Sequence, residues 1–314
     1  MLGALPAAPA PPPSTVATPA ASAPAAAVFP REITDGSGRK VLLPAAPHRI
    51  VSLSPAITEL VLAVGGGAEL VGVTRYCTVP EREPPIARVG GVLDPDYERI
   101  VALHPELVLI PNLADGQMLN RLQSLGLRVV VFYPEGLDNF VRDADLAGRA
   151  LAHEATAEAL TRQFTTERAL VHARLASPSP AARPTAALLY GGDLLAPGPA
   201  GFAGQLLDEA GARNVVPAAA KAWLQLTPES LLQYNPDFIF LVRESLAAWP
   251  PATQPALRNL AAVRAGRVIE LPENLFEHPG PTQGEALWRL ARALHPERFP
   301  EVAPPVEPSP PRSP

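Results

Sequence analysis

The sequence predicts an α/β protein of two related lobes, each with a mostly parallel sheet, joined by a single long helix. Short apolar strands alternate with helical segments through both halves of the chain, a pattern typical of parallel sheets covered by helices on both faces. A stretch of the first half recurs in the second half. Between the halves, residues 136–177 contain no proline, so nothing in that segment prevents a helix.

The central segment, residues 138–176, is expected to form two helices end to end, with a junction near Ala152–His153. The second helix would span ~35 Å at about 1.5 Å per residue. Its apolar face carries Leu160, Phe164, Val171 and Leu175, and the polar positions between them carry Glu158, Arg162, Glu167, Arg168 and Arg174. The first helix belongs with the preceding half.

These features divide the chain into five segments. Residues 1–30 form an Ala/Pro-rich segment and residues 300–314 a Pro-rich tail, and both contain too few large apolar side chains to pack, so we expect them to be disordered. Residues 31–152 form the N-terminal lobe, residues 153–177 the interlobe helix, and residues 178–299 the C-terminal lobe.

The N-terminal lobe is expected to begin with a hairpin, because residues 32–34 and 40–43 flank a Gly-rich turn. A strand at 49–53 then leads into a helix with Ser54 as N-cap and Pro55 at the first helical position. The elements that follow are a strand at 70–73, a helix that starts at Asp94-Pro95-Asp96 and ends at His104-Pro105, a strand at 107–110, a helix at 117–125 and a strand at 127–132.

The second half repeats part of this order. Residues 96–110 align without gaps on residues 227–241, which pairs Glu98 with Glu229 and one apolar strand with another. Shorter matches before and after this segment occur in the same order. Any two strand–helix units look somewhat alike, but three matches in one order favour two related lobes.

Composition excludes several classes of protein. Of the 314 residues, 47% are apolar and 18% charged, which indicates a globular protein with a core, and the net charge of −5 argues against nucleic acid or an anionic membrane as a partner. The sequence contains no run of about 18 apolar residues, which is the length that a membrane-spanning helix needs. The start of the chain has no Lys or Arg before Arg31, and proline interrupts its apolar runs, so no secretory signal is recognisable.

Several motifs together resemble one family. They are residues 47–55 with Thr58-Glu59, residues 71–74, and Gly90-Gly91 with Asp94-Pro95 and residues 98–103. Over about residues 31–300 the chain resembles the iron-complex and vitamin B12 class of ABC-transporter substrate-binding proteins, the helical-backbone class III, and most of all their cobalamin-binding type. The resemblance implies two Rossmann-like lobes, a ligand cleft between them, small closure motions, and a monomer located in the periplasm or otherwise outside the cytoplasm.

The resemblance also implies partners. In this family a glutamate on each lobe is thought to meet arginines of an ABC permease dimer, which works with ATPase subunits, and Glu98 and Glu229 match those positions. Carboxylates on the two lobes would orient and steer docking. The alternative is that acidic residues in a first helical turn only favour the helix dipole.

Candidate ligand-binding residues lie on loops that follow strands, where ligand sites of α/β proteins usually sit. They are Tyr76, Tyr190, Trp223, Asn274 and Phe276, with His278 nearby, and Trp223 is expected in a loop before the helix start at Thr227. Flat aromatic faces can pack a large planar ligand. The alternative for each is that it covers an edge of its lobe.

By resemblance, the transported ligand is cobalamin or a related corrinoid, with no resident cofactor. Ferric siderophores remain an alternative because Arg75, Arg88 and Arg243 could line the cleft, and haem is another, with Tyr76, Tyr190 or His278 as axial ligand. A cytosolic α/β enzyme or a sensor domain would be a different class.

Metal and catalytic motifs are not found. Cys77 cannot form an internal disulfide or a Cys-based zinc site, and a single buried cysteine usually behaves as a small apolar residue. The six histidines lack metal-ligand spacing, and no nucleophile elbow or paired-carboxylate motif occurs. We therefore expect no metal site and no catalytic residues.

Overall fold

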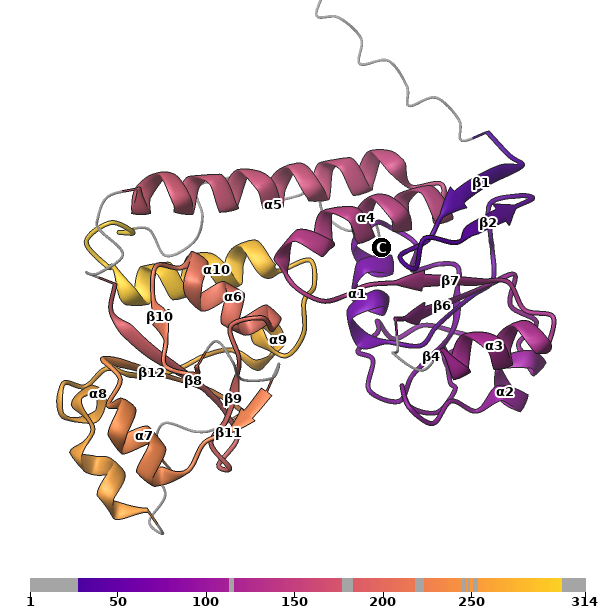
Figure 1. Cartoon of the computed structure of the whole chain (residues 1–314). Helices are drawn as coiled ribbons and strands as arrows, with labels where there is room; N and C mark the ends of the chain where they lie inside the picture. Colours follow the sequence, from indigo (N-terminus) through magenta and orange to yellow (C-terminus); the bar gives the residue numbers. More distant parts are fainter. Residues whose placement is uncertain are drawn as a thin grey trace, which may run out of the picture.

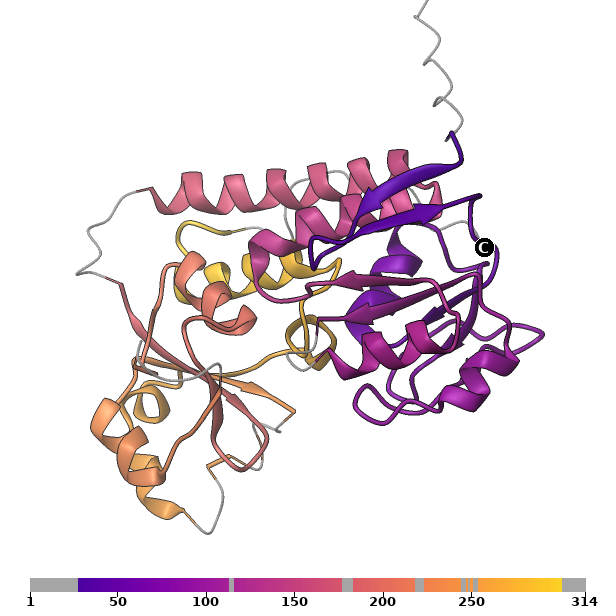
Figure 2. The same ribbon diagram turned by 45° about the vertical axis from the view of Figure 1, so that its right-hand side comes forward.

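The computed structural model describes residues 28–112, 116–176, 183–217, 223–243, 247, 249–250 and 254–300. Two α/β lobes lie side by side beneath one long helix, and Figures 1 and 2 show that this helix extends over both of them. The segments expected to be disordered, residues 1–30 and 300–314, lie almost entirely outside the described residues. No helix in the described ranges is long and apolar enough to cross a membrane.

The N-terminal lobe contains an antiparallel hairpin and a five-stranded, fully parallel sheet. The hairpin pairs β1 (Arg31–Thr34) with β2 (Lys40–Leu43), as predicted. The sheet has the order β5-β4-β3-β6-β7, from β3 (Ile50–Ser52), β4 (Leu70–Val73), β5 (Ala87–Arg88), β6 (Leu107–Pro111) and β7 (Val129–Phe132). The helices that cover it are α1 (Pro55–Ala63), α2 (Tyr97–Ala102) and α3 (Gln117–Ser124).

One predicted helix start is confirmed in position, and a second one differs from the prediction. Ser54 is the N-cap residue of α1, with Pro55 after it, but its side chain makes no capping hydrogen bond. Helix α2 begins two residues later than expected, because Asp96 rather than Asp94 is its N-cap and accepts a hydrogen bond from the Arg99 amide at 3.0 Å. Asp94 is thereby left available for a different contact, described below.

The C-terminal lobe has a mixed sheet. Its order is β11-β9-β8-β12-β13, with β10 paired to β8, from β8 (Thr185–Tyr190), β9 (Leu195–Pro197), β10 (Arg213–Asn214), β11 (Trp223–Gln225), β12 (Phe238–Val242) and β13 (Val268–Glu270). Its helices are α6 (Phe202–Glu209), α7 (Pro228–Tyr234), the 3-10 helix η3 (Pro255–Asn259), α8 (Ala261–Arg264), α9 (Glu273–Phe276) and α10 (Gln283–Leu294). β8, β10, β12 and β13 run parallel, whereas β9 is antiparallel to both β8 and β11.

The interlobe helices match the predicted pair. α4 (Leu137–Leu151) and α5 (Glu154–Leu175) meet at Ala152, whose φ of 63° ends the first helix without proline or glycine. The prediction that Glu167 lies on the polar side of α5 is wrong, because Glu167 is buried where α10 packs against α5. Its carboxylate accepts a hydrogen bond from the side-chain amide of Gln163 at 2.9 Å.

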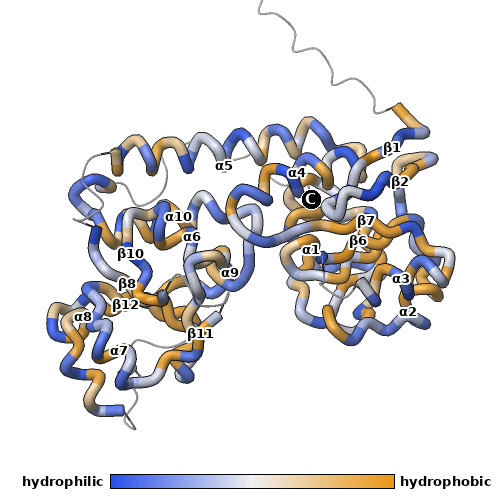
Figure 3. Tube along the Cα trace, in the orientation of Figure 1, coloured by the Kyte–Doolittle hydropathy of each residue, from blue (hydrophilic) through white to orange (hydrophobic). Residues whose placement is uncertain are grey.

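One apolar core connects the lobes. Buried residues from both sheets and from the helices between them form a single cluster that includes Leu109, Phe140, Phe164, Leu188 and Trp288. Two smaller clusters cover the opposite faces of the sheets, one in each lobe. In Figure 3 the strands are mostly hydrophobic, while hydrophilic and hydrophobic positions alternate along α5. The shared core restricts independent movement of the lobes near α5.

Candidate ligand-binding site

The carboxyl ends of the parallel strands β3, β7 and β13 lead into segments that meet where the two lobes come together. The segment after β13, residues 272–280, contacts α1, which follows the carboxyl end of β3. There the Nε2 atom of His278 lies 3.1 Å from Glu59 Oε1, an ion pair between the lobes when His278 is protonated. Ligands of α/β proteins bind outside the carboxyl ends of parallel strands, so this arrangement directs both lobes toward one site.

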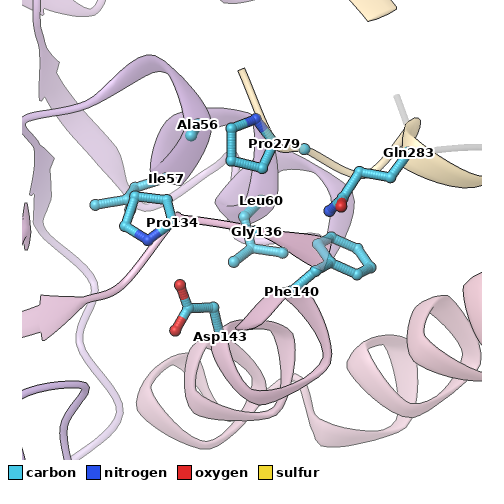
Figure 4. Close-up of a pocket in the computed structure, with 10 residues that line it drawn as sticks. Ala56, Ile57, Leu60, Pro134, Gly136, Phe140, Asp143, Pro279 and Gln283 are labelled. Atoms are coloured by element: carbon cyan, nitrogen blue, oxygen red, sulfur yellow. The ribbon is translucent and has the colours of Figure 1, made fainter. Parts of the chain in front are cut away.

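A small pocket lies where the lobes meet, next to the Glu59–His278 contact. It has room for about one water molecule. The residues that line it come from both lobes and are Ala56, Ile57, Leu60, Pro134, Gly136, Phe140, Asp143, Pro279, Gly280 and Gln283 (Figure 4). The pocket is therefore part of the joint between the lobes and is too small for an organic ligand.

Two buried polar side chains, Asp143 and Gln283, point into this joint (Figure 4). Asp143 is 3% exposed, and its Oδ2 atom accepts a hydrogen bond from the Tyr133 amide at 3.0 Å. Its Oδ1 atom has no hydrogen bond, and burial raises the pKa of Asp143 to about 6, although nearby Arg142 partly offsets this. Gln283 is 1% exposed, and neither amide atom of its side chain has a hydrogen-bond partner.

On the N-terminal lobe, Tyr76 is presented by a tight turn after β4. Its side chain is 63% exposed, whereas Thr74 and Cys77 on either side are buried. The Cys77 amide donates to the Thr74 carbonyl at 3.2 Å. The Sγ atom of Cys77 lies 3.0 Å from Thr74 Oγ1 and 3.2 Å from Thr58 Oγ1. These buried contacts hold the backbone of the turn, so that the Tyr76 ring is directed outward.

Arg75, Arg88 and Arg243, the arginines considered as anion ligands, are each engaged within the protein. Arg75 donates to both carboxylate oxygens of Asp94, at 2.7 and 2.8 Å. Arg88 donates to the carbonyls of Thr74 and Cys77, at 3.1 and 2.6 Å. Arg243 pairs with Glu273 at 2.6 Å and with Glu277. The positive charge of Arg75 and Arg243 is thus balanced by neighbouring carboxylates.

On the C-terminal lobe, Trp223 lies in the short strand β11 and not in the predicted loop. β11 pairs with β9, which places Trp223 opposite Pro197. The Trp223 ring packs edge-on against Tyr190, with ring centroids 4.9 Å apart, yet the residue stays 46% exposed. One side of this tryptophan is therefore supported by the lobe and the other is open to solvent.

Tyr190 and Phe276 do not occupy the positions we expected for ligand contacts. Tyr190 is buried, its hydroxyl donates to the Phe276 carbonyl, and burial raises its pKa. Phe276 is fully buried in the core, because residues 273–276 form the helix α9 rather than a loop. Asn274 is exposed on α9. Sequence reasoning identified the aromatic residues but could not separate the exposed rings from the rings that support them.

Glu98 and Glu229 occupy equivalent places in the two lobes. Each lies two residues after a capping residue, which is Asp96 for α2 and Thr227 for α7, and both glutamates are exposed. Figure 1 shows α2 and α7 at the ends of the lobes farthest from α5. Sequence reasoning missed Asp94 as the partner of Arg75 and missed Asp143 and Gln283, because no local pattern indicates contacts between such distant residues.

Within the described part of the chain, no three His, Cys, Asp or Glu side chains gather as a metal site. Cys77 is a buried free cysteine in the shared core. The features that remain are two exposed aromatic rings at the carboxyl ends of parallel strands, Tyr76 after β4 and Trp223 against Tyr190 of β8. We call these edges of the two lobes the facing edges. Two such lobes connected by a long helix are the architecture of a two-lobed solute-binding protein.

Comparisons with known proteins agree with that class. A family model described as periplasmic binding protein matches residues 50–275, and the chain belongs to this family. It is 26% identical over 280 residues to an uncharacterized ABC transporter substrate-binding lipoprotein, YvrC, of Bacillus subtilis, covering 87% of this chain and 88% of the relative. It is 28% identical over 285 residues to a cobalamin-binding protein of Halobacterium salinarum, covering 88% and 77%.

A solved structure has the same fold. The molybdate-binding protein MolA of Haemophilus influenzae superposes with a TM-score of 0.78 at 24% identity, covering 87% of this chain and 93% of that one. The predicted family and the two-lobed α/β fold are thus confirmed. The family and these relatives are described as binding proteins.

Proposed function

We propose that this protein is the solute-binding component of an ABC importer, which captures cobalamin or a related corrinoid and delivers it to the permease. The observation that carries the ligand proposal is the pair of exposed rings, Tyr76 on one lobe and Trp223 on the other, at the facing edges. Aromatic faces supply large apolar contact area to a planar ligand at a low cost in side-chain entropy. Exposed Asn274 would add a hydrogen bond at the rim.

The charges near these rings argue against a strongly anionic ligand. Arg75 and Arg243 are balanced by carboxylates, and Arg88 donates to backbone carbonyls. An anion such as molybdate would have to compete with Asp94, Glu273 and Glu277 for these guanidinium groups. A large ligand without concentrated negative charge would leave the pairs intact. The cobalamin-binding relative supports this choice, and the molybdate-binding relative makes molybdate the necessary comparison.

The ligand is tested by calorimetric titration of the purified protein with cyanocobalamin. We expect one-to-one binding that weakens about 30-fold or more in both Trp223→Ala and Tyr76→Ala, the size of an interface hot spot. Leu42→Ala is the matched control, because Leu42 is an exposed apolar residue of the β1–β2 hairpin, outside the facing edges. No heat with cyanocobalamin would reject the corrinoid, and titrations with a ferric siderophore, haemin and molybdate would then identify the ligand.

We further propose that Glu98 and Glu229 dock the protein on the two permease subunits. Both are exposed, on equivalent helices at the ends of the lobes away from α5 (Figure 1), where one flat partner could reach both at once. Charge reversal of both should abolish stimulation of the transporter ATPase without changing ligand affinity. Glu158→Arg, on exposed α5, is the control. Unchanged stimulation in the double variant would favour a sensor domain.

The same proposal places the protein outside the cytoplasm, where it acts as a monomer with no catalytic residues. Each lobe contributes one ring to the proposed site, so the site is complete within one chain. Light scattering after size exclusion should give the mass of a single chain with and without ligand. A stable dimer would contradict the monomer, and turnover of the bound ligand would favour the enzyme alternative.

A further inference from the structure

Arg75 is fixed by three neighbours on the N-terminal lobe. Its guanidinium carbon lies 5.0 Å from the centre of the Tyr76 ring. One terminal nitrogen donates to both oxygens of Asp94. The Arg75 amide also donates to the Gly90 carbonyl at 2.8 Å. Arg75 therefore links the turn that carries Tyr76 to the next turn, residues 90–95.

Gly91 provides the space for this ion pair. A Cβ atom at position 91 would overlap with Asp94 Oδ1 and come within 2.8 Å of Arg75 Nη2. Both of these atoms are ends of flexible side chains, so an alanine there would displace one or both of them from their present positions without removing either charge. Gly91→Ala thus offers a test of geometry alone.

The turn of residues 90–95 exposes an apolar side chain beside this pair. Leu93 is 83% exposed and lies between Gly91 and Asp94. The turn is held by hydrogen bonds from the Gly91 amide to the Asp94 carbonyl at 3.2 Å and from the Asp96 amide to the Val89 carbonyl at 3.0 Å. Leu93 is therefore displayed from a rigid turn that Arg75 ties to Tyr76.

We infer that the Arg75–Asp94 ion pair is a positioning element, which holds Tyr76 and Leu93 as one apolar ligand-contact face, and that Arg75 does not bind the ligand through its charge. This inference rests on the proposed ligand-binding function and extends it to three residues, Arg75, Asp94 and Leu93. A cation packed against one face of a tyrosine and paired with a carboxylate orders the ring while adding little net charge.

The binding test compares Asp94→Asn, Gly91→Ala and Leu93→Ala with the unmodified protein, using cyanocobalamin. We expect Asp94→Asn and Gly91→Ala each to weaken binding roughly two- to fivefold, as for loss of an exposed ion pair. Leu93→Ala should weaken it about fivefold through lost apolar contact. Asp145→Asn, which breaks the exposed Asp145–Arg149 pair on α4, is the matched control and should bind normally.

The two ways in which Arg75 could act predict opposite changes in ligand affinity for Asp94→Asn and Gly91→Ala. If its charge bound an anionic ligand, Asp94→Asn and Gly91→Ala would free the guanidinium and tighten binding of molybdate or a ferric siderophore. Such tightening, or cyanocobalamin binding equal to that of the unmodified protein, would overturn the positioning role. If Leu93→Ala binds cyanocobalamin as tightly as the unmodified protein, Leu93 is not a ligand contact.

A measurement without ligand separates this inference from the proposed function. Protein labelled with fluorotyrosine gives a fluorine resonance for Tyr76, which Tyr76→Phe identifies. We expect that resonance to shift in Asp94→Asn and Gly91→Ala but not in Asp145→Asn. If the unmodified protein binds no cyanocobalamin, the corrinoid proposal fails, whereas an unmoved Tyr76 resonance overturns the positioning role whatever the ligand.

Discussion

The two lobes present their exposed aromatic residues in different ways. Tyr76 of the N-terminal lobe stands on a turn held by polar contacts, from the buried Thr74–Cys77 pair to the Arg75–Asp94 ion pair. Trp223 of the C-terminal lobe stands on an edge strand and leans on the buried ring of Tyr190. One ring is thus oriented by hydrogen bonds and charge, and the other by packing.

This difference follows from the two sheets. The N-terminal sheet is entirely parallel, so its facing edge is made of turns, whose backbone groups must be satisfied by hydrogen bonds. The C-terminal sheet adds the antiparallel strands β9 and β11, which extend a strand surface where side chains support each other. Salt should therefore affect the Tyr76 side of the site more than the Trp223 side.

The lobes also pack against α5 differently. A substitution at this packing contact is expected to cause the largest change in the free energy of unfolding. Gly148 of α4 faces the helix junction, and a Cβ there would lie 2.6 Å from Ala157 Cβ and 3.2 Å from the Cα of Glu154. Gly148→Ala should therefore destabilise the protein by about 3 kcal/mol or more, because neither neighbour can move without shifting the helix. Urea unfolding measures this.

The matched change on the other lobe is Gly284→Ala in α10. Its Cβ would overlap with the carboxylate of Glu167, a side chain that can turn aside. We expect a loss of about 1 kcal/mol, since alanine also favours helix. A loss as large as that of Gly148→Ala would mean that the buried Glu167 cannot reorient, and the contrast between the lobes would disappear.

The next prediction concerns Asp143 in the joint between the lobes, where the stability of the protein should depend on pH. Burial raises the pKa of Asp143 from 3.8 to about 6, so the folded protein keeps a proton that the unfolded chain releases. Stability should fall as pH rises from about 4 to 6, and Asp143→Asn should remove that slope and stabilise the protein at pH 7.5 by up to about 3 kcal/mol. Melting temperatures across this pH range are the measurement.

Gln283, from the C-terminal lobe, is the neutral counterpart of Asp143 in this joint. Its side-chain amide is buried and has no hydrogen-bond partner. Gln283→Leu should stabilise the protein by about 1 kcal/mol at every pH, because it removes an unpaired polar group that does not titrate. A pH-dependent gain in this variant would show that Gln283 and the Asp143 carboxyl interact.

The last comparison concerns the two tyrosines. Tyr190→Phe leaves the buried Phe276 carbonyl without its hydroxyl donor, so we expect a loss of about 1 kcal/mol in stability. Tyr76→Phe should change stability little, because Tyr76 is exposed. Equal effects in thermal unfolding would contradict the assignment of one tyrosine as support and the other as contact.

Most of the secondary structure could be predicted because its signals are local. The strand 107–110 follows from an apolar run, and the helix start at Thr227 follows from capping residues within a few positions. The errors have a common cause. Trp223 is in a strand only because β9 pairs with it, and Glu167 is buried only because Gly284 of α10 lies beside it.

By itself, therefore, the sequence determined the order of the elements, the relation between the lobes and the family, since periodicity and motifs need no distant partner. Only the tertiary structure decided which aromatic rings are exposed, since Tyr190 and Trp223 differ by what packs on them and not by their local sequence. It also decided that Arg75 pairs with Asp94 and that Asp143 and Gln283 meet in one joint. Such contacts depend on the free energy of packing the whole chain, which no short segment contains.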